Sequence, residues 1–573
     1  MTPRRRAVFV TLACIAVGAL ALNLALRLRG PLTVSIAPRV LVFDVPAHVD
    51  EGPPPPSSSF DFLRRQRPGF HDLLFGVRNA AEDRSVSGLV LHVDRLDWGW
   101  ARVHEMCEAV RAFRRTGKPV VASLAGGGEK EYLLASATGL LAMPPVSTLQ
   151  LDGLSASALF LQGTYEKLGI RPNFNAVGRY KSAVEGYTRE TLSPEAREAL
   201  EALLDDQYGL LVGAIGSERG LAPDSVRRLI DGGPYSAAEA HARGLLDTLL
   251  AAVDVDSLAT HAGGARHPTY SFLRYAQEGT GTGERIALVV AEGEIVEGRS
   301  REGAFGGRSV GDRTLVDALR EIRARRGIRA VVVRIDSPGG SGDASDAVWQ
   351  ELRRLRREKP VVVSMGDVAA SGGYYLACAA DDVVAGPATI TGSIGVYGGK
   401  LNVLGLFRKL GLNVETVRRG EHAEMWSPYS DFTAEERASH QRSLEQFYRV
   451  FVSRVAEGRG MDPGAVDSVG QGRVWSGSAA HRRGLVDSLG GLHEAFELAR
   501  RRARIAPGAD IAIEVYPRPR RSLAQRWLGL LFEDAPQDES RFPAFAELGR
   551  WYRLAGTHGA ARLALMPYSI VIE

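Results

Sequence analysis

The sequence has few cysteines, little net charge and none of the usual metal-binding spacings. Its three cysteines, Cys14, Cys107 and Cys378, are too few for a disulfide framework or a cysteine-rich zinc site. The 71 basic and 67 acidic side chains leave a formal charge of only +4, which gives no indication of a nucleic acid partner. The chain contains no His-x-x-His or His-Glu-x-x-His spacing, so a metal centre is not favoured either.

The bulk composition is that of a globular protein. Hydrophobic residues make up 45% and charged residues 24% of the chain, which excludes a mainly disordered, collagen-like or multi-span membrane protein. With 573 residues the chain is too long for one hydrophobic core, so more than one domain is expected.

The N-terminus carries a long apolar run. Arg4, Arg5 and Arg6 precede apolar residues from 7 to about 26, and a helix needs about 20 such residues to cross a bilayer. The arginines should stay in the cytoplasm, which places the rest of the chain on the far side. A cleaved signal peptide with a small-residue site at Ala19–Ala21 is the alternative, but the apolar run continues past that site.

The chain contains an internal repeat. Lys118-Pro-Val-Val121 recurs as Lys359-Pro-Val-Val362, and His241-Ala-Arg-Gly-Leu-Leu-Asp247 recurs as His481-Arg-Arg-Gly-Leu-Val-Asp487, in the same order and at nearly the same offset. The sequence therefore predicts two homologous domains. The predicted organisation is a cytoplasmic N-terminus (1–6), a transmembrane anchor (7–27), an N-terminal domain (38–255), a linker (256–283), a C-terminal domain (284–500) and a C-terminal extension (501–573).

Both halves alternate short apolar runs with amphipathic segments, which predicts an α/β fold with parallel strands buried on both faces. Helices are expected to begin after Ser193 and, with a capping box, after Thr433. The predicted strands of the second half are 330–335, 360–365, 382–385 and 392–396, and its predicted helices include 344–356 and 372–380.

Two adjacent glycines follow the first of these strands. Gly339 and Gly340 allow backbone N–H groups to approach a ligand closely, as an oxyanion hole requires. The first half has Arg95–Trp98 at the equivalent place and lacks the glycines. A simple tight turn is the alternative.

A serine and a lysine are lost reciprocally between the halves. Ser371 lies between a strand and a helix, where the first half has Glu129 or Lys130; Lys181 of the first half corresponds to Glu421. This pattern suggests one site assembled across both domains, with a desolvated lysine as the base for a serine nucleophile. A helix N-cap is the alternative role for the serine, and a surface cation is the alternative for the lysine.

Four motifs together resemble the long, two-domain bacterial signal peptide peptidases, also called protease IV. They are Tyr180–Glu185, Asp336–Gly340, Ala369–Tyr375 and Thr391–Val396, in that order. The resemblance implies tandem duplicated domains with a fold similar to the Clp protease subunit and the crotonases, following an N-terminal transmembrane helix.

The same resemblance implies residue roles. Ser371 matches the nucleophile and Lys181 the general base, while Ser393 matches a serine that hydrogen-bonds the lysine. Gly340, with Gly339, matches the oxyanion turn, and the N–H of Gly372 is expected to be a second donor. The family requires no cofactor.

The resulting expectation is a membrane-anchored serine endopeptidase on the extracytoplasmic side of the bacterial inner membrane. It would degrade cleaved signal peptides and other apolar or unfolded peptides, and the resemblance implies a homotetramer with sites facing an inner cavity. A non-proteolytic crotonase-like membrane scaffold is one alternative, which the retained Ser371 and Lys181 oppose. A crotonase-type acyl-CoA enzyme is another, which the anchor opposes because the domains would lie away from CoA thioesters.

Overall fold

The computed structural model describes residues 38–52, 68–260, 267–278, 281, 283–302, 308–518 and 563–565. Within these ranges, none of the helices combines the length and the apolar character that a membrane crossing needs. The predicted cytoplasmic N-terminus and anchor, residues 1–27, lie outside the described residues.

The described part of the first half forms a six-stranded parallel sheet in the order β8-β4-β3-β2-β1-β9. Its strands are β1 (Arg39–Asp44), β2 (Val86–Val93), β3 (Val120–Leu124), β4 (Leu140–Met143), β8 (Thr248–Leu249) and β9 (Thr269–Ser271). A short pair is formed by β5 (Thr148–Leu149) and β7 (Tyr235–Ser236). The helical segments are α2 (Phe70–Glu82), α3 (Trp100–Arg114), α4 (Glu129–Ser136), α5 (Gln162–Leu168), η2 (Ser182–Val184), α6 (Glu185–Thr188), α7 (Pro194–Arg219), α8 (Pro223–Asp231), α9 (Ala237–Ala242), α10 (Ala252–Thr260) and α11 (Phe272–Glu278).

The second half repeats this plan, as the predicted α/β pattern requires. Its sheet has the order β20-β18-β16-β14-β10-β22, with β17 between β16 and β21, and is parallel apart from the β18–β20 pair. Its strands are β10 (Glu284–Glu292), β14 (Ile328–Ser337), β16 (Val361–Ala370), β17 (Asp382–Ala385), β18 (Ile390–Gly392), β20 (Val474–Ser476), β21 (Ser488–Leu489) and β22 (Ile511–Tyr516). Its helices are α12 (Asp312–Ala324), α13 (Gly342–Arg356), α14 (Gly372–Ala377), α15 (Leu404–Lys409), α16 (Ala434–Arg459), α17 (Pro463–Val469), α18 (Gly477–Arg482) and α19 (Leu492–Arg502).

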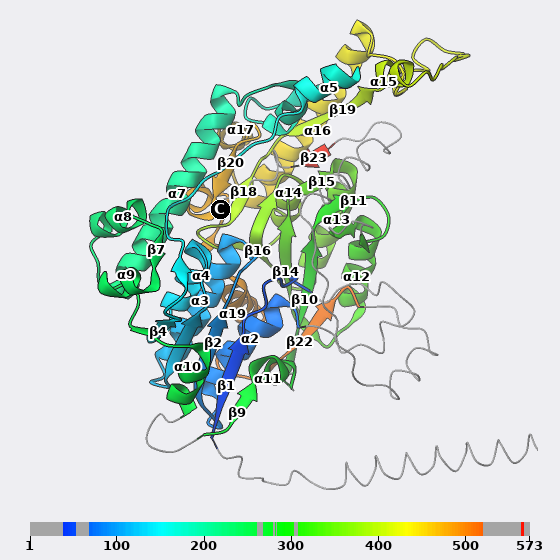
Figure 1. The fold of residues 1–573 in the computed structure, drawn as a ribbon. Helices are drawn as coiled ribbons and strands as arrows, with labels where there is room; N and C mark the ends of the chain where they lie inside the picture. Colours follow the sequence, from blue (N-terminus) through cyan, green and yellow to red (C-terminus); the bar gives the residue numbers. More distant parts are fainter. Residues whose placement is uncertain are drawn as a thin grey trace, which may run out of the picture.

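A third sheet joins the two halves. Its order is β12-β13-β11-β15-β23-β19-β6, and β6 of the first half pairs antiparallel with β19 along its whole length, from Arg171 opposite Asn402 to Val177 opposite Val396. β23, from the far C-terminus, lies between β15 and β19 (Figure 1). The strands are β6 (Arg171–Val177), β11 (Glu294–Val296), β12 (Arg301–Glu302), β13 (Arg308–Gly311), β15 (Gly339–Ser341), β19 (Val396–Asn402) and β23 (Leu563–Leu565).

Local contacts repeat between the halves. The Tyr132 hydroxyl donates to the Leu245 carbonyl at 2.9 Å, and the Tyr374 hydroxyl donates to the Leu485 carbonyl at the same distance. The long helices α7 and α16 both have 26 residues and begin at the predicted caps, Ser193 and Thr433. These matched contacts show that the sequence repeat is also a structural repeat.

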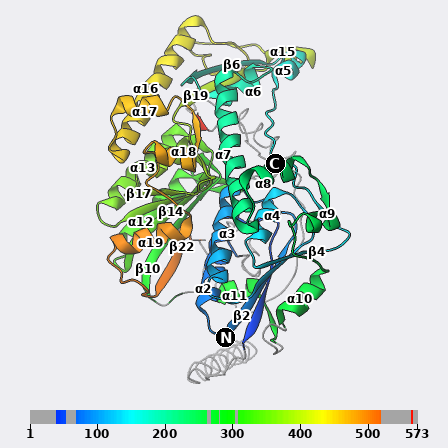
Figure 2. The same ribbon diagram turned by 90° about the vertical axis from the view of Figure 1, so that its left-hand side faces the viewer.

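The halves share a core. α3 lies between the two main sheets (Figure 2), and one hydrophobic cluster contains Phe70 of α2, Val332 of β14 and Phe496 of α19. The segment predicted as a linker, 256–283, contributes β9 to the first sheet and α11, which contacts α2. This cluster contains buried side chains from both halves, so the two halves pack against each other and hold the site that lies between them.

Candidate active site

Three side chains with predicted catalytic roles meet in the structure. Lys181 Nζ lies 2.8 Å from Ser371 Oγ and 3.0 Å from Ser393 Oγ, and it also contacts the Ser393 carbonyl at 3.2 Å. All three residues are buried, with Ser371 and Ser393 fully inaccessible and Lys181 only 3% exposed. The reciprocal loss seen in the repeat thus corresponds to a real contact between the halves.

Ser371 directly follows β16 and adopts a backbone conformation that is rare for a residue with a side chain. Its φ is 54° and its ψ is −112°, and such strain persists only where the surroundings impose it. It occupies the N-cap position of α14, yet within the described chain its hydroxyl makes no capping hydrogen bond. The alternative role of a helix cap is therefore not realised, and the hydroxyl is directed at Lys181 instead.

Lys181 reaches the second half because β6 carries it there. After the last β6–β19 pair the chain turns, and the Tyr180 N–H donates to the Gln471 carbonyl at 2.8 Å. Gly472 has φ 78°, and a Cβ there would lie 2.6 Å from Lys181 Cα. The sequence reasoning missed Gln471 and Gly472; the paired glycines at 470 and 472 were the available signal.

Burial dominates the electrostatics of the lysine. It lowers the pKa of Lys181 well below its ordinary value, because a charged ammonium group loses its water shell there. Ser393 has φ 51° and lies between β18 and β19, with its N–H donating to the Arg473 carbonyl at 2.7 Å. The predicted continuous strand 392–396 is therefore wrong: the chain breaks at Ser393, which turns this residue toward Lys181.

The glycine turn lies beside the serine. β15 contacts α14, and Gly340 has φ 158° with so little room that a Cβ would lie 1.9 Å from the Ile295 carbonyl oxygen. The Gly339 N–H already donates to Ser337 Oγ at 3.2 Å. Gly372 is the first residue of α14, where N–H groups have no acceptor within the helix. Of the three predicted donors, Gly340 and Gly372 are therefore the better candidates.

The corresponding region of the first half is filled by its own carboxylates. Glu129, at the position of Ser371, accepts hydrogen bonds from the N–H groups of Asp152 at 3.0 Å and Gly153 at 2.8 Å. Glu131 accepts one from the N–H of Leu96 at 2.6 Å. The first half thus uses the region that corresponds to the Ser371 site for hydrogen bonds of its own.

Comparison with known proteins also divides the chain into two similar halves. The model of peptidase family S49 matches the chain twice, at residues 112–263 and 353–506. The chain belongs to peptidase family S49. The two matches fall in the two halves of the repeat, so this S49 peptidase is a duplicated protein, and as a family member it is a serine peptidase.

Three relatives of this S49 peptidase illustrate the similarity. The chloroplastic serine protease SPPA of Arabidopsis thaliana is 34% identical over 455 residues, covering 78% of this chain and 67% of the relative. Protease 4 of Salmonella typhi is 32% identical over 458 residues, covering 77% and 73%. A putative signal peptide peptidase SppA of Enterococcus faecium is 29% identical over 247 residues, covering 43% and 71%.

Proposed function

We propose that Ser371 and Lys181 form the catalytic dyad of a membrane-anchored serine endopeptidase that degrades cleaved signal peptides and other apolar or unfolded peptides. The observation that carries the proposal is the 2.8 Å contact between Lys181 Nζ and Ser371 Oγ in a buried site. A neutral lysine at that distance is within reach of the hydroxyl proton.

In the proposed reaction, Lys181 takes the proton of Ser371 as Oγ attacks the scissile carbonyl carbon. The N–H groups of Gly340 and Gly372 hold the oxyanion, and one such donor contributes about 3–4 kcal/mol in comparable sites. Lys181 then returns the proton to the leaving amine, and a water molecule hydrolyses the acyl-enzyme by the same route. Ser393 keeps Nζ oriented through its 3.0 Å contact.

An extended peptide suits this site. β23 pairs antiparallel with β15 and places Ala564 opposite Gly340, so the backbone beside the glycine turn accepts an extended segment, and a substrate peptide would take the position of β23. Folded proteins offer few free strands of this kind. The name of the Enterococcus faecium relative supports signal peptides as the substrate class.

The proposal is tested with the full-length protein in detergent, a synthetic signal peptide and a folded protein of similar length. We expect the peptide to be cut, the folded protein to stay intact, and a fluorophosphonate probe to label Ser371. An intact peptide, or labelling of another serine in place of Ser371, would contradict the assignment.

The proposed architecture is a pair of tandem Clp protease/crotonase-like domains held by the 7–27 anchor on the extracytoplasmic side of the bacterial inner membrane, assembled as a homotetramer. The projecting region around α5 and α15 supports association (Figure 1). It exposes large apolar side chains, including Leu159 at 71%, Leu410 at 65% and Val417 at 82%, and such grouped exposure is typical of interaction sites.

Substitution of Leu410 by aspartate is expected to lower the molar mass of the detergent-extracted protein from four chains toward one, because a charge would enter the proposed apolar interface. Val253→Asp is the matched control, since Val253 is equally exposed, at 69%, on the distant α10. Light scattering after membrane extraction measures both variants. A wild-type monomer, or recovery of the wild type in the soluble fraction, would refute this part of the proposal.

A further inference from the structure

The strand that carries Ser371 contains a bulge just before the serine. Ile335 of β14 pairs with Met365, but Ser337 pairs with Ala369, so β16 spans four residues where β14 spans two. Gly366, Asp367 and Val368 make up the bulge. A bulge redirects the strand that follows it, and here that strand segment ends at the serine.

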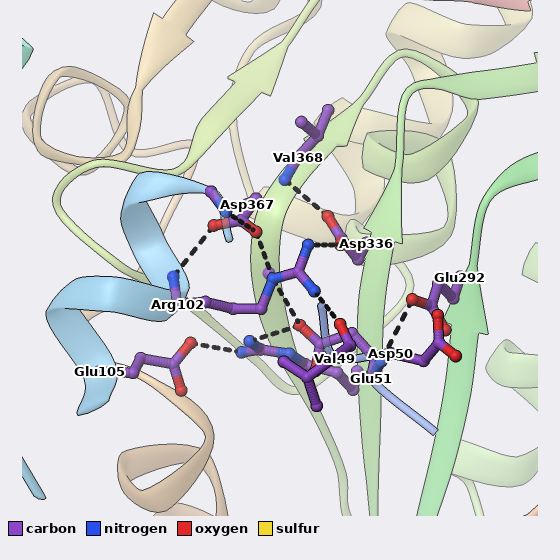
Figure 3. A network of polar contacts seen from close by, with 12 residues as sticks. Val49, Asp50, Glu51, Arg102, Glu105, Glu292, Asp336, Asp367 and Val368 are labelled. Carbon is purple, nitrogen blue, oxygen red and sulfur yellow. Dashed lines mark hydrogen bonds and ion pairs between the residues drawn. The ribbon is translucent and has the colours of Figure 1, made fainter. Parts of the chain in front are cut away.

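A helix of the first half holds this bulge (Figure 3). Asp367 accepts hydrogen bonds from the Gly99 N–H at 3.1 Å and the Arg102 N–H at 3.0 Å, both at the N-terminus of α3, and it also pairs with the Arg102 guanidinium group. The fit leaves no space for a side chain at position 99, because a Cβ there would lie 2.1 Å from Asp367 Cγ.

Arg102 also contacts the strand that leads to the glycine turn. Its Nη2 lies 3.3 Å from an oxygen of Asp336, whose other oxygen accepts the Val368 N–H at 2.9 Å. Its Nη1 donates to the Val49 carbonyl at 2.7 Å. One guanidinium group therefore joins the end of β14, the bulge of β16 and the first half.

The surrounding charges make this arginine hard to replace. Glu51 and Glu105 pair with Arg334 at 2.8 and 2.7 Å, whereas Arg102 pairs with Asp336 and Asp367 and lies 3.9 Å from Glu51. Burial, opposed by Arg102 but aided by Asp367, raises the pKa of Asp336 to about 7. Burial acts in the same direction on Asp367, but the charge and hydrogen bonds of Arg102 lower its pKa below the ordinary value.

We propose that Arg102 is a positioning residue of the active site, through which the first half fixes the relative placement of the Ser371 segment and the oxyanion turn. The inference rests on the proposed dyad. The first half then supplies two residues to catalysis. Lys181 is the base that contacts the serine, and Arg102 holds together the two strands that lead to the serine and to the oxyanion turn. A misplacement of about 1 Å at such a site costs up to about a hundredfold in rate.

The test compares Arg102→Met with Arg111→Met in the full-length protein. Arg111 lies on the same helix, has a similarly buried side chain and pairs with Glu218 inside the first half. Peptide kinetics, the affinity for a peptide boronic acid and the melting temperature are measured for both. Arg102→Met is expected to lower kcat by about 10- to 100-fold with KM within about twofold, and to weaken boronate binding in parallel, because both depend on the oxyanion geometry. Arg111→Met is expected to keep kcat.

Two further variants keep the test decisive if Arg102→Met does not fold. Arg102→Lys restores the charge and is expected to recover part of the lost kcat, while Gly99→Ala displaces Asp367 and is expected to lower kcat without removing any charge. Unchanged kcat in folded variants, or equal losses of kcat in both arginine variants in step with melting temperature, would overturn the inference. A wild type that the fluorophosphonate probe does not label at Ser371 would instead overturn the proposed function, whatever Arg102 does.

Discussion

Replacement of Ser371 by alanine is expected to lower kcat by about 10⁴-fold or more, because it removes the proposed nucleophile and with it the acyl-enzyme route. KM should change little, since the hydroxyl contributes to bond making more than to substrate binding. Cleavage of a fluorogenic peptide measures the effect, and the fluorophosphonate label should disappear together with the activity.

The matched control for this variant is Ser136→Ala. Ser136 is a buried serine of α4, the first-half counterpart of α14, and its hydroxyl donates to the Leu133 carbonyl. The control should retain wild-type kcat. If Ser371→Ala kept more than about 1% of the wild-type kcat, catalysis through a covalent intermediate on Ser371 would be excluded.

Replacement of Lys181 by methionine is expected to lower kcat by about 10²- to 10⁴-fold, the usual contribution of a general base. The wild type should gain activity with rising pH, because protonation of Lys181 removes the base and burial depresses its pKa. The same depression means that the unfolded chain binds more protons, so this residue makes the free energy of unfolding rise with pH up to the ordinary lysine pKa.

Measurement of kcat at a series of pH values distinguishes a lysine that acts as a general base from one that is only a buried cation. Lys181→Arg keeps the positive charge but does not deprotonate, so it should stay inactive at every pH. In Lys181→Met, the residual kcat should no longer fall at low pH, because the group that titrates has been removed. Lys400→Met is the control, because Lys400 is a largely buried lysine of β19 that contacts Glu424 and Ser430. A Lys181→Arg variant with substantial activity would contradict the assignment.

Features determined by neighbouring residues could be predicted from the sequence. The caps of α7 and α16 depend on Ser193 and Thr433 within one turn, and the structure has both. The pairing of Lys181 with Ser371 was also within reach, because two copies of one domain expose by comparison the positions where each copy has changed.

Features determined by distant residues could not be predicted. The break at Ser393 depends on the carbonyl of Arg473, and the placement of Lys181 depends on Gln471 and Gly472. The contact of Arg102 with Asp367 joins residues 265 positions apart. Neither Arg102 nor Asp367 lies in a local sequence pattern that distinguishes it from an ordinary surface charge, so only the packed structure reveals that they pair.

The strand pair β6–β19 has a consequence for the order of synthesis. Lys181 precedes Ser371 by 190 positions, and the loop that seats the lysine, at Gln471 and Gly472, is made later still. A growing chain that has completed only its first half carries the proposed base without the proposed nucleophile, and Glu129 occupies the position that corresponds to Ser371. Under the proposed function, the dyad therefore forms only after the second half has been made and has packed against the first.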